Sequence, residues 1–137
     1  MFKRLLIAID LEQEALAEKA LRTALAVGGQ EAQYLVMTVL PPIRGGIVAS
    51  YLPSNYDKRL KAEMAEKLAR FVEARFPGQK YHCLVAHGPV YEEINIAAKQ
   101  HNADLIVVSA VKPGSTGLGP NAARVARYGE SSVLIIR

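Results

Sequence analysis

The sequence contains a single cysteine, Cys83, which excludes an internal disulfide and suits a reducing cytoplasm. Long apolar runs are also missing. The apolar run near the start of the sequence, residues 5–9, is too short for a signal peptide or a membrane span. Zinc-ligand spacing and basic runs interleaved with aromatic residues are absent too, so we expect no nucleic-acid partner. These absences predict a cytoplasmic protein that acts neither in a membrane nor on nucleic acid.

Half of the chain is hydrophobic, which is enough for one compact domain over residues 1–137 with a sizeable core. The 17 Lys and Arg residues exceed the 13 Asp and Glu residues, and the net charge is +4 at pH 7. A positive excess favours anionic partners. A phosphorylated small molecule therefore fits this composition better than a nucleic acid does.

Short apolar runs alternate with amphipathic stretches along the whole chain. The apolar runs predict five strands, at residues 5–9, 34–40, 81–86, 104–110 and 132–136. Helical spacing predicts four helices, of which the first spans 12–27 and the last 121–128. The second is a long helix that follows a capping signal at Ser54 and ends near 76–78, and the third has Pro89 at its first position. This alternation predicts a doubly wound α/β domain, with a five-stranded parallel sheet of order 3-2-1-4-5 and helices on both faces.

In such a sheet, ligands bind outside the carboxyl ends of the strands, at the point where the strand order reverses. Asp10, at the tip of the first strand, and the Gly-rich segment 111–121 are expected to flank one crevice there. Small residues in that segment let backbone N–H groups approach an anion, and the helix N-terminus that follows adds partial positive charge. The sequence therefore predicts a phosphate-binding crevice.

The order and spacing of several segments resemble those of a universal stress protein. Four of these segments end or follow the predicted strands: 6–10, 38–41, 87–89 and 104–109. The remaining segments lie in the last third of the chain, at 110–114, 119–125, 127–128 and 132–137. In this order they resemble the branch of the family whose tails read Ser-His-Arg-Pro, Gly-Ser-Asn-Ala-Ala, Arg-His and Val-Leu-Val-Val-Arg. The resemblance covers essentially the whole chain.

The resemblance implies a cytoplasmic homodimer that binds ATP or AMP, with Mg²⁺ accompanying ATP. It places Asp10 near the nucleotide and the backbone of Val39 against the adenine. It also implies a regulatory role without a dedicated catalytic residue, and at most slow ATP hydrolysis or autophosphorylation. The last strand, predicted at the sheet edge, makes Val133–Ile136 the candidate homodimer seam, since unpaired edges recruit partners.

The loop after the fourth strand departs from the family pattern, Gly-x2-Gly-x9-Gly-Ser/Thr. Ser109 and Lys112 replace the two early glycines, six residues separate Lys112 from Gly119, and Pro120 replaces the hydroxyl residue. Pro120 removes an N–H donor from the phosphate cradle, whereas the Lys112 ammonium offers a charge-assisted bond instead. The candidate nucleotide-binding residues are Asp10, Val39, Ser109, Lys112, Gly119 and Asn121.

Three hypotheses stay open on the sequence. The first is a regulatory dimer that binds an adenine nucleotide, and the second is a dimeric interaction protein of the same fold whose crevice the shortened loop has closed. The third is a small enzyme that acts on a phosphorylated metabolite through Asp10 and Lys112, and it ranks last because no nucleophile and base are paired. We expect no zinc site, because His82 and Cys83 point to opposite faces of their strand.

Overall fold

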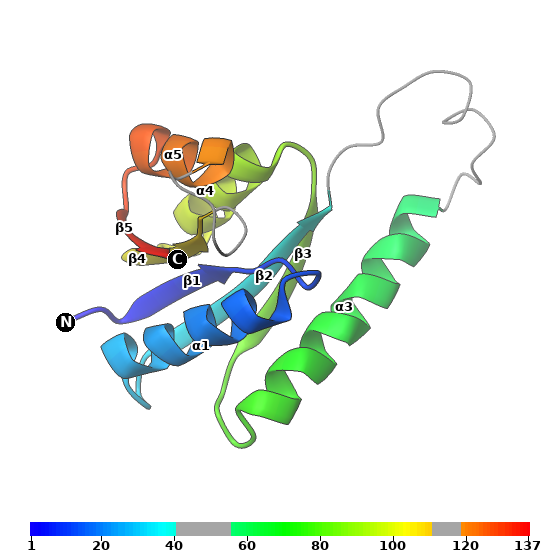
Figure 1. The fold of residues 1–137 in the computed structure, drawn as a ribbon, viewed down its shortest axis with the longest axis horizontal. Coiled ribbons are helices and arrows are strands. Elements are labelled where there is room, and N and C mark those ends of the chain that lie inside the picture. Colours follow the sequence, from blue (N-terminus) through cyan, green and yellow to red (C-terminus); the bar gives the residue numbers. More distant parts are fainter. Residues whose placement is uncertain (41–55, 111–118) are drawn as a thin grey trace.

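The computed structural model describes residues 1–40, 56–110 and 119–137, and the main elements are drawn in Figure 1. The strands are β1 (Arg4–Ala8), β2 (Gln33–Leu40), β3 (His82–His87), β4 (Leu105–Ser109) and β5 (Ser132–Ile136). The helices of the described ranges are α1 (Glu14–Gly28), α3 (Tyr56–Arg75), α4 (Val90–Gln100) and α5 (Gly119–Tyr128). None of these helices has the length and hydropathy needed to cross a membrane.

The five strands form one parallel sheet of order β3-β2-β1-β4-β5, which confirms the predicted topology. β1 is the central strand, and its Ile7 pairs with Val36 of β2 on one side and with Val107 of β4 on the other. The chain proceeds outward from β1 to β2 and β3, then crosses back to β4. The order therefore reverses between β1 and β4, where a doubly wound sheet forms its crevice.

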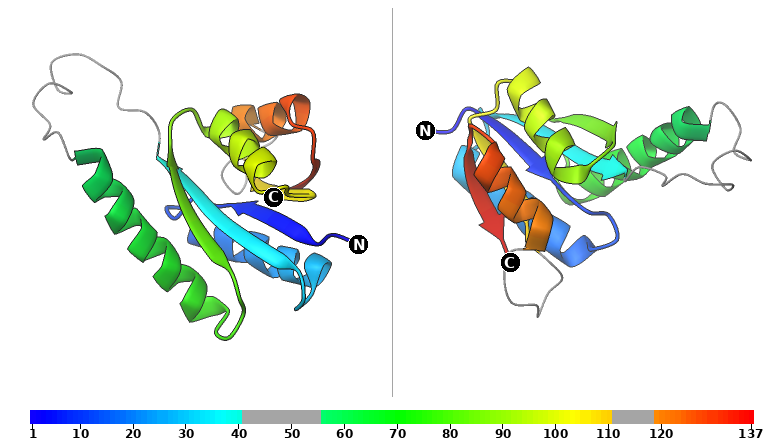
Figure 2. Two further views of the ribbon diagram at one scale, coloured as in Figure 1. Left: turned by 180° about the vertical axis from the view of Figure 1, so that it is seen from behind. Right: turned by 90° about the horizontal axis from the view of Figure 1, so that it is seen from above.

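Helices cover both faces of the sheet, and a separate apolar core lies under each pair (Figures 1 and 2). Alternate residues of a strand point to opposite faces. Leu5 and Ile7 of β1 therefore pack with α1 and α3, whereas Leu6 and Ala8 pack with α4 and α5. This burial on both faces explains why the central strands are continuous apolar runs.

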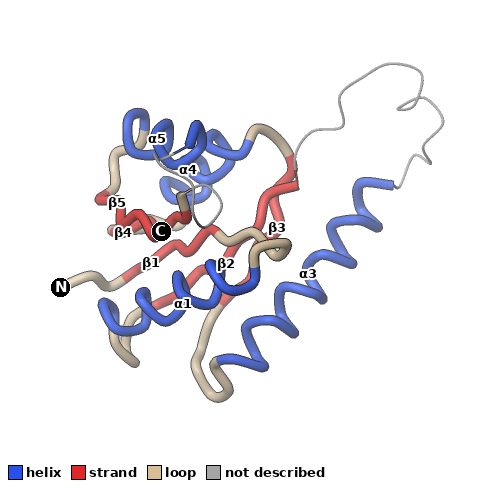
Figure 3. Tube along the Cα trace, in the orientation of Figure 1, coloured by secondary structure: helices blue, strands red, loops and turns tan. Residues whose placement is uncertain are grey.

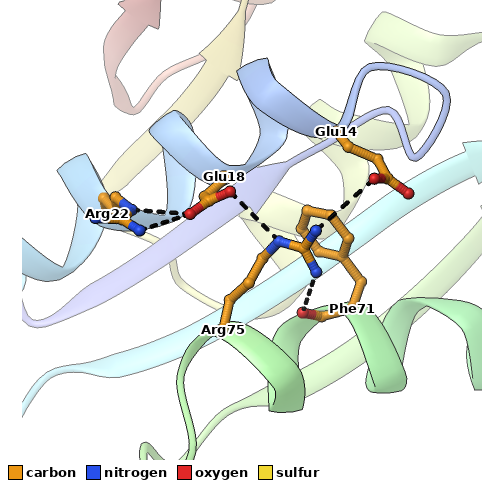
Figure 4. Close-up of polar contacts among 5 residues, drawn as sticks. All are labelled: Glu14, Glu18, Arg22, Phe71 and Arg75. Atoms are coloured by element: carbon orange, nitrogen blue, oxygen red, sulfur yellow. Dashed lines mark hydrogen bonds and ion pairs between the residues drawn. The ribbon is translucent and has the colours of Figure 1, made fainter.

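Arg75, at the end of α3, ties that helix to α1 (Figure 4). Its guanidinium lies 3.8 Å from the Glu14 carboxylate and 3.6 Å from that of Glu18, measured N to O. The same group donates a hydrogen bond of 3.3 Å to the Phe71 carbonyl oxygen and stacks 3.8 Å from the centre of the Phe71 ring. Glu18 is also hydrogen-bonded to Arg22, so one ion-pair network spans the two helices.

Several predicted element ends differ from the structure, each for a local reason. The first helix begins at Glu14 rather than at residue 12, because the Glu12 amide donates to the Asp10 carboxylate at 2.9 Å and forms a turn. Figure 3 draws the segment between β1 and α1 as a loop. Pro89 precedes α4 in an extended conformation, with ψ 129°, so the prediction of a first helical position was wrong. The capping signal at Ser54 lies outside the described residues.

Candidate functional site

A cavity of about 480 Å³ opens at the carboxyl ends of β1, β2 and β4, where the strand order reverses. The turn that follows β1 and the first turn of α1 line one side of it. The first residues of α4 and α5 line the other side. The cavity therefore occupies the position that the sequence predicted for a ligand crevice.

The residues selected from the sequence converge on this cavity, although they are distant along the chain. Those of them that line it are Asp10, Val39, Ser109, Gly119 and Asn121. Lys112 falls in the range 111–118, outside the described residues, together with Gly114 and Gly117. The structure thus brings together every candidate that it describes.

Asp10 has a structural task as well as a place in the cavity wall. Its Oδ1 accepts the Glu12 amide at 2.9 Å, and its carbonyl oxygen accepts the Gln13 amide at 2.9 Å. These bonds form the turn between β1 and α1, a position where aspartate is common. The side chain is exposed at the strand tip, so the turn holds a carboxylate at the cavity wall.

The cavity wall near β2 is mostly apolar, with Thr38 as its polar member. Val39 and Leu40 come from the strand, Met64 from α3, and Val90 and Ile94 from α4. A wall of this kind suits a flat heterocyclic ring, which gains free energy when its faces leave water. Met64 and Val90 come from helices on opposite faces of the sheet, and no local sequence signal indicated that both would line one cavity.

The opposite wall is the first turn of α5, which carries no acidic residue. Gly119 begins the helix with φ +74°, a left-handed conformation that costs glycine little. Pro120 follows and has no backbone N–H, whereas Asn121 and Ala122 keep theirs. Unpaired amides and the helix dipole make such a helix start attractive to an anion.

None of the side chains with a shifted pKa is among the residues that line this cavity. Burial raises the pKa of the Cys83 thiol, so the group stays protonated and poorly nucleophilic at neutral pH. Burial and a hydrogen bond to the Glu73 carboxylate together raise the pKa of Tyr81 to about 12. Among the described residues, no group of three or more His, Cys, Asp or Glu side chains is arranged to hold a metal ion.

A second, more open hollow of about 1320 Å³ lies at the other end of the sheet. Tyr34, Glu73 and Tyr81 are among the residues that line it. It is larger than the first cavity, but it faces the amino ends of the strands. Ligands of doubly wound sheets bind at the carboxyl ends, so we take the smaller cavity as the candidate site.

The parallel sheet, its helices on both faces and a cavity at the reversal of strand order define a doubly wound α/β protein. The model of the universal stress protein family matches residues 1–137, and the chain belongs to that family. The resemblance inferred from the sequence is thereby confirmed. Universal stress protein G of Shigella flexneri is 27% identical over 145 residues, and the match covers 100% of both chains.

Solved structures share the fold at lower sequence identity. The universal stress protein UspA from Lactobacillus plantarum superimposes with a TM-score of 0.71 at 21% identity, covering 98% of this chain and 97% of that one. A universal stress protein from Archaeoglobus fulgidus in complex with dAMP gives 0.61 at 16% identity, covering 98% of both chains. A family member from Arabidopsis thaliana with AMP bound gives 0.64 at 16%, covering 98% and 90%.

Proposed function

We propose that this protein binds an adenine nucleotide, ATP or AMP, in the cavity at the carboxyl ends of β1, β2 and β4, and acts as a regulatory homodimer. The observation that carries the proposal is the composition of the cavity, which has an apolar wall at one end and a helix N-terminus at the other. The base packs against the apolar wall, and the phosphate lies at the helix start. The complexes of two structural neighbours with dAMP and AMP support this choice of ligand.

Each candidate residue has a defined part in the proposed complex. Val39 lies against the base, Asp10 beside the sugar, and Gly119 and Asn121 beside the phosphate. With ATP, Mg²⁺ would accompany the phosphates, and the Asp10 carboxylate is an oxygen ligand of the kind that this cation takes. The part proposed for Lys112, a charge-assisted bond to phosphate, rests on the sequence alone.

The proposed homodimer forms through the edge strand β5. β5 lies at the end of the sheet beside β4, and its residues Val133, Leu134 and Ile135 are only partly buried. An apolar edge with unpaired backbone groups favours pairing with a second strand. Sedimentation over a range of concentrations tests this seam, since a protein that stays monomeric at every concentration would contradict it.

The test of nucleotide binding begins with mass spectrometry of any small molecule released when the freshly purified protein is denatured. Calorimetric titrations with ATP, ADP and AMP follow, on the wild type and on Asp10→Ala. We expect saturable binding that weakens about tenfold in the variant, the size of one lost charge-assisted hydrogen bond. Glu31→Ala, an exposed carboxylate at the other end of the sheet, is the control and should bind as the wild type does.

The outcomes separate the hypotheses that the sequence left open. A protein that is purified empty and ignores all three nucleotides would contradict the proposal and favour an interaction protein of the same fold. Multiple turnover of a phosphorylated compound, lost in Asp10→Ala, would instead favour an enzyme.

A further inference from the structure

The outer surface of α4 and α5 carries two tyrosines in contact, Tyr91 from α4 and Tyr128 from α5. The two helices lie side by side on one face of the sheet (Figure 2). The ring centres of the tyrosines lie 5.9 Å apart. Tyr128 is 61% exposed, and Tyr91 is partly buried. Tyrosine is enriched at protein interfaces, because its ring buries apolar area at a low cost in conformational entropy.

Positive charge lies on the α5 side of this tyrosine pair. The guanidinium of Arg124 lies 5.4 Å from the centre of the Tyr91 ring, and that of Arg127 lies 5.6 Å from the centre of the Tyr128 ring. Both arginines are exposed, and α5 itself contains no acidic residue. Neither forms an ion pair with a carboxylate among the described residues, Glu130 included. Their charges are therefore available to a carboxylate from outside the subunit.

Negative charge lies on the α4 side of the pair. The first turn of α4 contains Glu92 and Glu93. Glu92 is exposed, and its Oε1 accepts the hydroxyl of Tyr91 at 3.1 Å, which holds the carboxylate beside the ring. Glu93 lies against Gly88 instead. The surface around the tyrosines thus has an acidic half on α4 and a basic half on α5.

These two halves complement each other in a second copy of the chain. In a two-fold symmetric contact, the same surface serves on both subunits. A two-fold axis in the plane of this surface, running between α4 and α5, places α5 of each subunit against α4 of the other. The arginines of each subunit then face Glu92 of the other, and the tyrosine pairs meet at the centre. A uniformly acidic or basic ligand would match only one half of the surface.

We propose that Tyr91, Glu92, Arg124, Arg127 and Tyr128, here called the α4–α5 patch, form a self-association interface whose occupant is the same patch of another copy. The tyrosine rings exclude water at the centre of the contact, and the ion pairs around them fix its orientation. The interface is distinct from the β5 seam, because it uses helices on one face of the sheet rather than an edge strand. A chain with both interfaces assembles beyond the dimer.

Charge reversal tests the contact, with sedimentation velocity over a range of concentrations as the measurement. Arg127→Glu sets a carboxylate against Glu92 of the other subunit, and Glu92→Arg sets a cation against Arg127. Like charges across an interface are unfavourable, so we expect the dissociation constant to rise about tenfold or more in each variant. The double variant Arg127→Glu/Glu92→Arg restores opposite charges, and its dissociation constant should return close to that of the wild type.

Arg70→Glu is the matched control. It makes the same change of charge as Arg127→Glu at an arginine of α3 that is 70% exposed, on the opposite face of the sheet. It should associate as the wild type does. Tyr128→Ser removes the exposed ring at the centre of the contact and should weaken association without any change of charge. Circular dichroism of each variant should match the wild type, which separates lost association from lost folding.

The size of the change separates this interface from the β5 seam. A tetramer that falls to a dimer in both single variants supports both interfaces, and a dimer that falls to a monomer supports the α4–α5 patch in place of the seam. An assembly that neither single variant changes overturns the proposal and leaves the seam. A wild type that stays monomeric overturns both. Single variants that lose association without recovery in the double variant overturn the two-fold pairing on which the proposal rests.

Discussion

The two ends of the sheet differ in how their polar side chains are hydrogen-bonded. At the amino ends, the Asp104 carboxylate accepts the backbone amides of Lys3 at 2.9 Å and Arg4 at 3.0 Å. Ser131 Oγ donates to the Ala103 carbonyl oxygen at 2.9 Å in the same region. At the carboxyl ends, by contrast, the Ser109 hydroxyl has no hydrogen-bond partner among the described residues, and the side chains there line a cavity.

This difference suggests that the two ends serve different purposes. Polar groups that are paired within the protein stabilise the fold, whereas those left open at a cavity are available to a ligand at some cost in stability. Substitutions at the amino ends should therefore lower the free energy of unfolding and leave nucleotide affinity unchanged. Substitutions of residues that line the cavity at the carboxyl ends should chiefly weaken nucleotide binding.

The largest effect is expected from Gly28→Val, at the end of α1 close to the start of β2. A Cβ atom on Gly28 would lie 2.6 Å from the Tyr34 hydroxyl oxygen and 2.9 Å from Leu5 Cδ1, and both side chains are buried. Overpacking of this kind lowers the free energy of unfolding by about 1–3 kcal/mol. Urea denaturation measures the change, and calorimetry with AMP should show no loss of affinity.

Val27→Ala is the control for Gly28→Val, since Val27 is 40% exposed and its truncation should change stability little. A Gly28→Val protein as stable as the wild type would show that this end of the sheet is less tightly packed than the contacts indicate. A stable variant with weakened AMP binding would contradict the division between the two ends.

Asp104→Asn is expected to have the next largest effect, about 1–2 kcal/mol at pH 7 after allowance for the exposure of the carboxylate. Burial acts to raise the pKa of Asp104, but the amide hydrogen bonds from Lys3 and Arg4 outweigh it, and the net pKa lies below its usual value. A lowered pKa in the folded state stabilises the protein above the unfolded pKa. The advantage is lost as the pH falls through the folded pKa.

The measurement is urea denaturation of the wild type and Asp104→Asn between about pH 7 and pH 3. The difference in the free energy of unfolding should stay constant down to about pH 4 and then shrink. Glu31→Gln, an exposed carboxylate at the same end of the sheet, serves as the control. A difference that does not depend on pH would mean that the charge of Asp104 contributes nothing.

The smallest effect is expected from Arg75→Gln, in the ion-pair network between α1 and α3. Its side chain is 27% exposed, so water and salt weaken its pairs with Glu14 and Glu18, and we expect a loss of about 0.5–1 kcal/mol. Part of that loss should disappear in 1 M salt, which screens the ion pairs. Arg70→Gln is the matched control, because Arg70 is 70% exposed and pairs only within α3. Equal losses for the two variants would show that the link between the helices adds nothing.

The sequence predicted more of the fold than of the site. Strand order and layers follow from apolar runs that alternate with helical spacing, and the parallel sheet confirms them. Asp10 was found because it follows a strand end, and strand ends of one sheet meet at one edge, whereas Val39 was found only through the family resemblance. The apolar lining from Met64 and Val90 was not predicted, because helical periodicity shows that a helix face is buried but not which residues line a cavity at the sheet edge.

The paired groups at the amino ends were also missed. Asp104 was assigned to a strand, whereas the structure makes it the acceptor for two amides about a hundred residues earlier in the chain, that of Lys3 just before β1 and that of Arg4 at its start. Likewise, the sequence suggested Ser109 as a ligand contact only because it replaced a family glycine. Whether a hydroxyl is paired depends on atoms distant in the chain, and no local pattern reports it.

The central claim is that an adenine nucleotide binds at the carboxyl ends of the strands and nowhere else in the described fold. Amide NMR spectra of the 14.9 kDa protein, recorded during titration with AMP, test it most directly. We predict saturable shifts at Asp10, Val39 and Gly119, with none at Lys3 or Tyr34 at the opposite end. Shifts centred on Tyr34 and the hollow beside it, or no shifts at all, would contradict the claim.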